Sequence, residues 1–102
     1  MTLMLAVQAP APYVYVDNRA IVISNGLHGV LFSRALTRWL SETLEILALE
    51  KRGTRIQQQH VFGGHVADNG DVVLFAGSHD DVVSVQLSAS AFAAFQESLT
   101  HN

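Results

Sequence analysis

Three of the five histidines lie in the stretch of the chain that is richest in chemically reactive side chains. His60 and His65 flank a pair of glycines, and His79 comes immediately before two aspartates. Neutral imidazoles are common ligands of zinc and copper, and paired imidazoles form a pH-sensitive contact because histidine titrates near neutral pH. A metal site or an acid–base site is therefore the first chemical hypothesis for this stretch.

The spacing of His60 and His65 argues against a shared site. Side chains of a strand point alternately to its two faces, so residues five apart lie on opposite sides of a sheet. The apolar residues of the segment have the same parity as His60 and would share a core face with it: Ile56, Phe62 and Val66. A bulge at Gly63-Gly64 would unite the histidines but would turn Val66 outwards. The apolar pattern does not favour such a bulge, but glycine pairs do mark bulges, so the sequence leaves the question open. We expect the segment to build the sheet rather than hold a ligand.

The cross-strand register suggests a different histidine pair. Residues 68–71 (DNGD) predict a tight hairpin turn, because Asn-Gly readily takes positive φ. With a two-residue turn, His65 faces Leu74. His60 then faces His79 if the strands pair that far, which makes these two the best metal or acid–base candidate. A glycine shortly before His79 favours an earlier turn, so isolated histidines remain the favoured interpretation and no metal ligand is predicted.

Other candidate chemistry is weaker. Residues 77–81 (GSHDD) contain the ingredients of a catalytic triad, but neighbours on one tight turn do not converge in space as a triad requires. Gly63-Gly64 lacks the lysine and the Ser/Thr of a phosphate-binding loop. The absence of cysteine excludes disulfides, thiol catalysis and thiolate zinc sites. We therefore predict no catalytic residue, no cofactor and no enzymatic activity.

Two helices and about five strands are expected to position these residues. Ser33 is a candidate cap of a long helix whose apolar stripe comprises Leu36, Trp39, Leu40, Leu44 and Leu47. Arg38 and Glu42 are spaced to pair on its outer side, and Gly53 suits its left-handed end. Ser88 is a candidate cap of a C-terminal helix with an apolar stripe of Phe92, Phe95 and Leu99.

Alternating and β-branched segments predict the strands at 13–16, 20–24, 55–61, 72–76 and 81–87. The order is ββαβββα. Strands joined by short turns predict an α+β fold, with an antiparallel sheet of about five strands and both helices on one face. Residues 13–102 form a single domain in this interpretation. Residues 1–12 form an arm or an extra strand, because Leu3, Leu5 and Val7 alternate with other residues before Pro10 and Pro12.

The composition bears on partners. Only 15% of the 102 residues are charged, against about 25% in typical soluble domains, while 49% are apolar. So much apolar material is hard to bury in one small copy, which favours a homo-oligomer or a bound partner. The net charge of −3 lacks the basic stripe that nucleic acids require and would suit a basic protein partner. No apolar run is long enough for a membrane span.

A partner-binding surface is predicted from side chains expected to point outwards, namely Tyr13, Tyr15, Gln57, Gln59 and His65. Tyr13 and Tyr15 share one face of their strand, and tyrosine buries a large area at low entropic cost. The glutamines lie in a polar stretch typical of an exposed edge. In the alternative, the tyrosine face meets the helices and belongs to the core.

These observations predict a small acidic protein-interaction module of the cytoplasm that acts by docking on a protein partner, as a homodimer. Inhibitors, immunity proteins and adaptors of bacteria or their phages are of this size and charge. The alternative is a small metal-binding or ligand-binding domain, or an enzyme, that uses His60, His65 and His79.

Overall fold

The computed structural model describes residues 13–16 and 20–101, whose strands form two antiparallel sheets. The three-stranded sheet has the order β1 (Tyr13–Val16), β2 (Ala20–Ser24), β3 (Gly29–Ser33). The four-stranded sheet has the order β4 (Arg52–Gln57), β5 (His60–Val66), β6 (Val72–Ser78), β7 (Asp81–Leu87). The helices are η1 (Arg34–Leu36), α1 (Thr37–Glu50) and α2 (Ala89–His101). The arm or strand expected at residues 1–12 lies outside the described residues.

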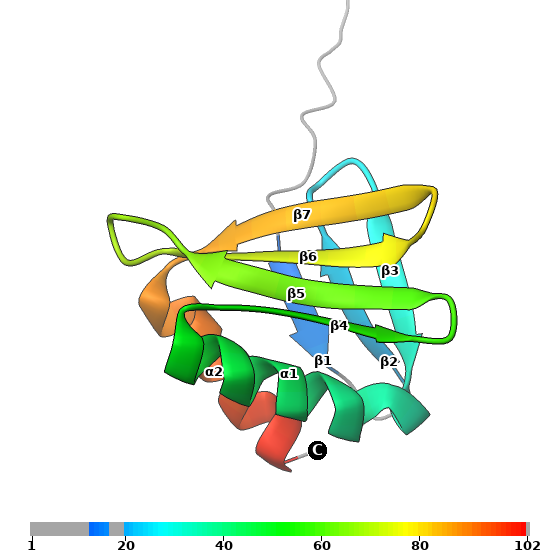
Figure 1. Cartoon of the computed structure of the whole chain (residues 1–102), viewed down its shortest axis with the longest axis horizontal. Helices are drawn as coiled ribbons and strands as arrows, with labels where there is room; N and C mark the ends of the chain where they lie inside the picture. Colours follow the sequence, from blue (N-terminus) through cyan, green and yellow to red (C-terminus); the bar gives the residue numbers. More distant parts are fainter. Residues whose placement is uncertain (1–12, 17–19, 102) are drawn as a thin grey trace, which may run out of the picture.

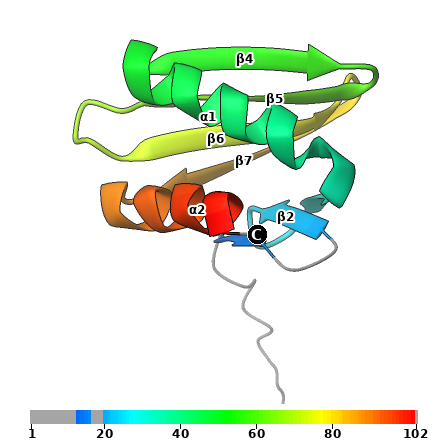
Figure 2. The same ribbon diagram turned by 90° about the horizontal axis from the view of Figure 1, so that it is seen from below.

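The two sheets and both helices enclose one core. Strands β1–β3 run steeply across strands β4–β7, and the helices lie along one side of both sheets (Figure 1). Helix α1 packs against β4 and β5, whereas α2 packs against β1 and β7 (Figure 2). The rings of Phe32 on β3, Trp39 on α1 and Phe62 on β5 meet at centroid distances of 6.2 Å. The inner faces of the two sheets therefore face each other across these rings.

The predicted α+β class, the antiparallel pairing, the long helix and the C-terminal helix are confirmed. The strands are more numerous than expected and belong to two sheets. Residues 29–33, which pattern alone gave no reason to treat as a strand, form β3. The expected single strand at 55–61 is instead a hairpin of β4 and β5, which reverses at Gln58 with a φ of 56°.

The helix ends were predicted correctly in one case of three. Ser88 caps α2, because its hydroxyl accepts a hydrogen bond from the Ala91 N–H at 3.2 Å. Ser33 makes no such bond, since β3 extends to this residue and a 3-10 turn precedes α1. Lys51 takes the left-handed position at the end of α1 with a φ of 66°, where Gly53 was expected. Gly53 lies within β4, where an added Cβ would lie 3.0 Å from Ile46 of α1.

The turn between β5 and β6 is one residue longer than predicted. The Ala67 N–H donates to the Asp71 carbonyl at 2.7 Å, and Gly70 has a φ of 91°. Hairpin loops of three residues commonly end in a left-handed glycine of this kind. The register therefore shifts by one, and His65 faces Val73 instead of Leu74.

Candidate interaction surfaces

The three histidines lie in three different environments. His60 is half-buried, and its ring lies 5.5 Å from that of Phe32. His65 is exposed on the opposite face of β5, as strand parity predicted. His79 is exposed in the turn between β6 and β7, immediately after Ser78 pairs with Asp81. Gly77 lies within β6 and pairs with Val61 and Val82, so the turn expected to begin at this glycine is instead a two-residue hairpin turn, His79-Asp80, at the surface.

The pairing of His60 with His79 that the predicted cross-strand register suggested is not formed. Strand β5 pairs with β6 no further than Val61 with Gly77, and His60 pairs with Gln57 on the other side. Within residues 13–16 and 20–101, no group of three or more His, Cys, Asp or Glu side chains is placed to hold a metal ion. The geometry therefore lends no support to a histidine-based site.

Gly63-Gly64 is not bulged, because the pairing runs without interruption to β4 and β6. This answers the question that the sequence left open. The glycines instead allow close packing on both faces of β5. A Cβ at Gly64 would lie 2.6 Å from the Val73 carbonyl oxygen and 3.1 Å from Leu47 Cδ2 of α1. A Cβ at Gly63 would collide with the Gly53 carbonyl and lie 2.7 Å from Phe75 Cζ. Gly64 therefore lets α1 pack closely on β5, and Gly63 leaves room for the ring of Phe75.

The outer face of the four-stranded sheet carries no described helix or strand in front of it (Figure 1). Its side chains form three cross-strand rows: Ile56–Val61–Gly77–Val82, Thr54–Gly63–Phe75–Ser84 and Arg52–His65–Val73–Gln86. The first row is apolar, and Ile56 and Val82 are 61% and 52% exposed. The third row is mostly polar. We call this surface the β4–β7 outer face.

The outer face of the three-stranded sheet is the second exposed apolar surface. Tyr13 and Tyr15 are 44% and 54% exposed, and Leu31 is 65% exposed. Tyr15, Val22 and Leu31 are neighbours in one cross-strand row. The intervening Val14 and Val16 pack on the core, so the tyrosines point outwards and do not meet the helices. We call Tyr13, Tyr15, Val22 and Leu31 the tyrosine face.

The five residues predicted as one surface are divided among three places. The outer faces of the two sheets point away from each other, because Phe32 and Phe62 meet between the sheets. His65 and the tyrosines therefore lie on sheet faces that point in opposite directions. Gln57 and Gln59 are exposed at the β4–β5 turn. Sequence reasoning missed Val82 and also Leu31, whose strand was not recognised. It wrongly placed Ile56 on the core face, because the reversal at Gln58 puts Ile56 on the outer face of β4. With the strands placed correctly, the alternation of inward and outward side chains would have identified all three as exposed.

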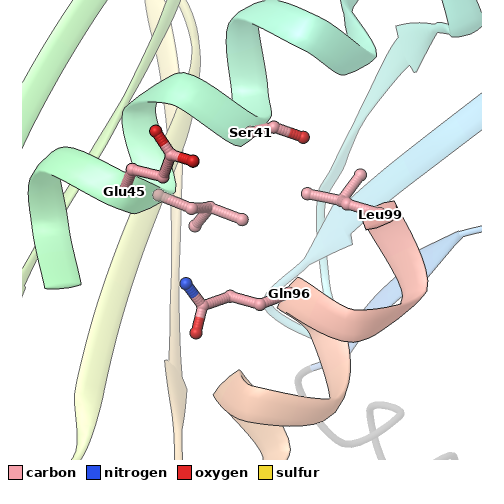
Figure 3. A pocket seen from close by; sticks show the side chains of 5 residues that line it. Ser41, Glu45, Gln96 and Leu99 are labelled. Carbon is pink, nitrogen blue, oxygen red and sulfur yellow. The ribbon is translucent and has the colours of Figure 1, made fainter. Parts of the chain in front are cut away.

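Two shallow hollows flank α1. One of about 250 Å³ lies between α1 and β4 and is lined by Ala35, Arg38, Trp39, Glu42, Arg55 and Gln57. In it, Glu42 pairs with Arg55 at 3.3 Å and, as predicted from the helix spacing, approaches Arg38 at 3.9 Å. The other, of about 150 Å³, lies between the two helices and is lined by Ser41, Leu44, Glu45, Gln96 and Leu99 (Figure 3). Both are smaller than the roughly 300–1,000 Å³ of typical small-molecule sites.

The described residues thus form an α+β fold with two antiparallel sheets, and the outer face of each sheet carries exposed apolar side chains. Among the described residues, none of the helices is long and apolar enough to cross a membrane. No protein-family model, curated protein or solved structure matches the chain.

Proposed function

We propose that this chain is a small protein-interaction module that docks on a protein partner and works as a homodimer. The tyrosine face is the observation that carries the proposal. In type the module resembles inhibitors, immunity proteins or adaptors that work in the cytoplasm of bacteria, including bacteria infected by phage. The lack of cysteine in the chain accords with such a reducing compartment.

The tyrosine face has the chemistry of the centre of a protein interface. Its three most exposed side chains are Tyr13, Tyr15 and Leu31, and none of its four members carries a charge that a partner would have to desolvate. Tyrosine is enriched among the residues that dominate binding energy, since it buries a large area with few rotamers to order. The surface lies on paired strands, so its side chains are held in position before binding.

The adjoining β2–β3 turn extends this apolar surface. Leu27 is 75% exposed at the end of the sheet where Ser24 pairs with both Tyr13 and Gly29. The Asn25 side-chain oxygen accepts hydrogen bonds from the Leu27 and His28 N–H groups at 2.9 and 2.8 Å. The turn is therefore fixed by its own hydrogen bonds, and little ordering is required when a partner packs on Leu27.

The charge of the chain favours a basic partner. The tyrosine face itself is uncharged, so the net charge of −3 acts at a distance by steering the encounter instead of forming contacts within the interface. Association with such a partner should therefore slow at high ionic strength, while the dissociation rate changes less.

Affinity capture with matched leucine variants tests the proposal. Leu31→Glu places a charge in the tyrosine face, whereas Leu49→Glu makes the same change at an 83% exposed position on α1. The wild type and Leu49→Glu should capture the same protein from native cells, and Leu31→Glu should bind that protein at least 10-fold more weakly. Equal capture by all three, or no specific capture by any, would contradict the proposal.

A further inference from the structure

The β4–β7 outer face is graded from apolar to polar along its strands. At the end near the β4–β5 turn, Ile56 and Val82 stand exposed on the two edge strands. At the opposite end, Arg52 lies on β4 and Gln86 on β7. No described residue between these rows carries a formal charge, since the middle row is Thr54–Gly63–Phe75–Ser84. When two copies of this face are stacked on each other, one arrangement brings apolar residues opposite apolar residues and polar residues opposite polar residues.

That arrangement is a two-fold axis parallel to the strands, in the plane between two stacked copies. It exchanges β4 with β7 and β5 with β6 but keeps each row opposite the same row of the partner. Ile56 then lies opposite Val82 of the partner subunit, apolar on apolar. In the middle row, Phe75 lies opposite Gly63 of the partner subunit, a large side chain against the position with none. Stacked sheets whose strands are nearly aligned are a standard packing.

The polar row supplies charge complementarity in the same arrangement. The Gln86 side-chain amide donates to the Asp71 carboxylate at 2.8 Å, which holds this carboxylate at the β7 side of the face. Arg52 is exposed at the β4 side. The axis therefore places Arg52 opposite Gln86 and Asp71 of the partner subunit, and the symmetry makes this pair twice. Charge-assisted hydrogen bonds between arginine and carboxylate are among the strongest in proteins.

The other simple stacking is excluded by the same rows. An axis perpendicular to the strands would reverse the row order and bury Arg52 against Ile56 of the partner subunit. An arginine buried against an apolar side chain with no partner is strongly unfavourable. Only the axis along the strands satisfies both ends of the face.

The size of the face indicates a weak, reversible dimer. Four strands about 4.8 Å apart and about six residues long, at about 3.3 Å each, give a flat footprint of about 380 Å² per copy. Two copies give a flat total of about 760 Å², which projecting side chains increase, and which lies below the roughly 1,200–2,000 Å² of stable interfaces. The expected dimer is therefore weak and reversible.

We propose that two copies of this chain associate through their β4–β7 outer faces, about a two-fold axis parallel to the strands, with Arg52 of each paired to Asp71 of the partner subunit. This names the interface for the homodimer in the proposed function and rests on it. The docking of another protein on the tyrosine face does not depend on it, because the two surfaces point away from each other.

Complementary charge variants test the arrangement. In Arg52→Asp the introduced carboxylate faces Asp71 of the partner subunit, and in Asp71→Arg the introduced guanidinium faces Arg52, so each variant repels itself at both pairs. Each should dissociate at least 10-fold more readily than the wild type in sedimentation velocity across 1–500 µM. An equimolar mixture of the two variants should dimerise again, because both pairs in the mixed dimer unite opposite charges.

The mixing step separates the interface from misfolding, since an unfolded variant would not regain association by meeting another. Arg34→Asp makes the same charge change on η1, away from the face, and should leave the wild-type dimer intact. A wild type that stays monomeric throughout, single variants that remain dimeric, or a mixture that stays monomeric would each overturn the proposal. Leu31→Glu should still dimerise, so loss of the partner and loss of the dimer are distinguishable.

Discussion

Replacing Gly64 with alanine tests how closely β6 and α1 approach this position of β5. The added Cβ would lie 2.6 Å from the Val73 carbonyl oxygen and 3.1 Å from Leu47 Cδ2. The carbonyl belongs to the neighbouring strand and cannot move without disturbing the ladder. Overpacking of this kind costs about 1–3 kcal/mol, partly offset by about 0.4–1 kcal/mol from the reduced freedom of the unfolded chain. The expected net loss of unfolding free energy is about 1–2 kcal/mol.

Urea denaturation and thermal melting measure this loss. In a domain of this size, 1 kcal/mol corresponds to about 4–8 °C, so the melting temperature should fall by about 4–16 °C. Gly29→Ala is the matched control, because a Cβ there would have its nearest neighbour, the Ile23 carbonyl oxygen, at an ordinary 3.5 Å. The control should be neutral or slightly more stable. A Gly64→Ala variant as stable as the control would refute the close approach of the Val73 carbonyl and Leu47 to Gly64.

Three further predictions concern the core, the ion pair and the histidines. Phe62→Ala should lower the unfolding free energy by about 3–5 kcal/mol in urea titration, because it removes the fully buried ring between Phe32 and Trp39; a loss below about 1 kcal/mol would contradict this packing. Glu42→Gln should cost no more than about 1 kcal/mol, with the difference shrinking in high salt, since the pair is partly exposed; a larger, salt-independent loss would be unexpected. Equimolar zinc should leave the melting temperature of both the wild type and His79→Ala unchanged. A rise of several degrees in the wild type alone would instead support a metal site that includes His79.

The elements that depend on local periodicity were predictable from the sequence. The apolar stripes of both helices are buried as expected, and the five-residue spacing correctly separated His60 from His65. These features follow from the helical and strand repeats alone, whatever the rest of the chain does.

The elements that depend on distant contacts were not predictable. The reversal at Gln58 has no glycine, proline, asparagine or aspartate to mark it, and its left-handed backbone is held by the pairing of β4 with β5. The five residues of β3 carry no alternation of their own and become a strand by pairing with β2, where Phe32 enters the core.

The candidate interaction surfaces were predictable only in part, for the same reason. Outward tyrosines on β1 follow from parity, and their exposure is confirmed. Which exposed residues gather on one surface depends on how the two sheets are stacked, and this is set by the rings of Phe32, Trp39 and Phe62 far apart in the chain. The predicted surface was therefore assembled from residues that the fold separates.

Site-specific photo-crosslinking in native cells tests the central claim of a docking module most directly. A photoreactive phenylalanine analogue would replace Tyr15 in the tyrosine face or, as the control, Leu49 on α1. The account predicts that the probe at position 15 crosslinks one defined protein and that the probe at position 49 does not. No crosslink at position 15, or the same set of products from both positions, would contradict it.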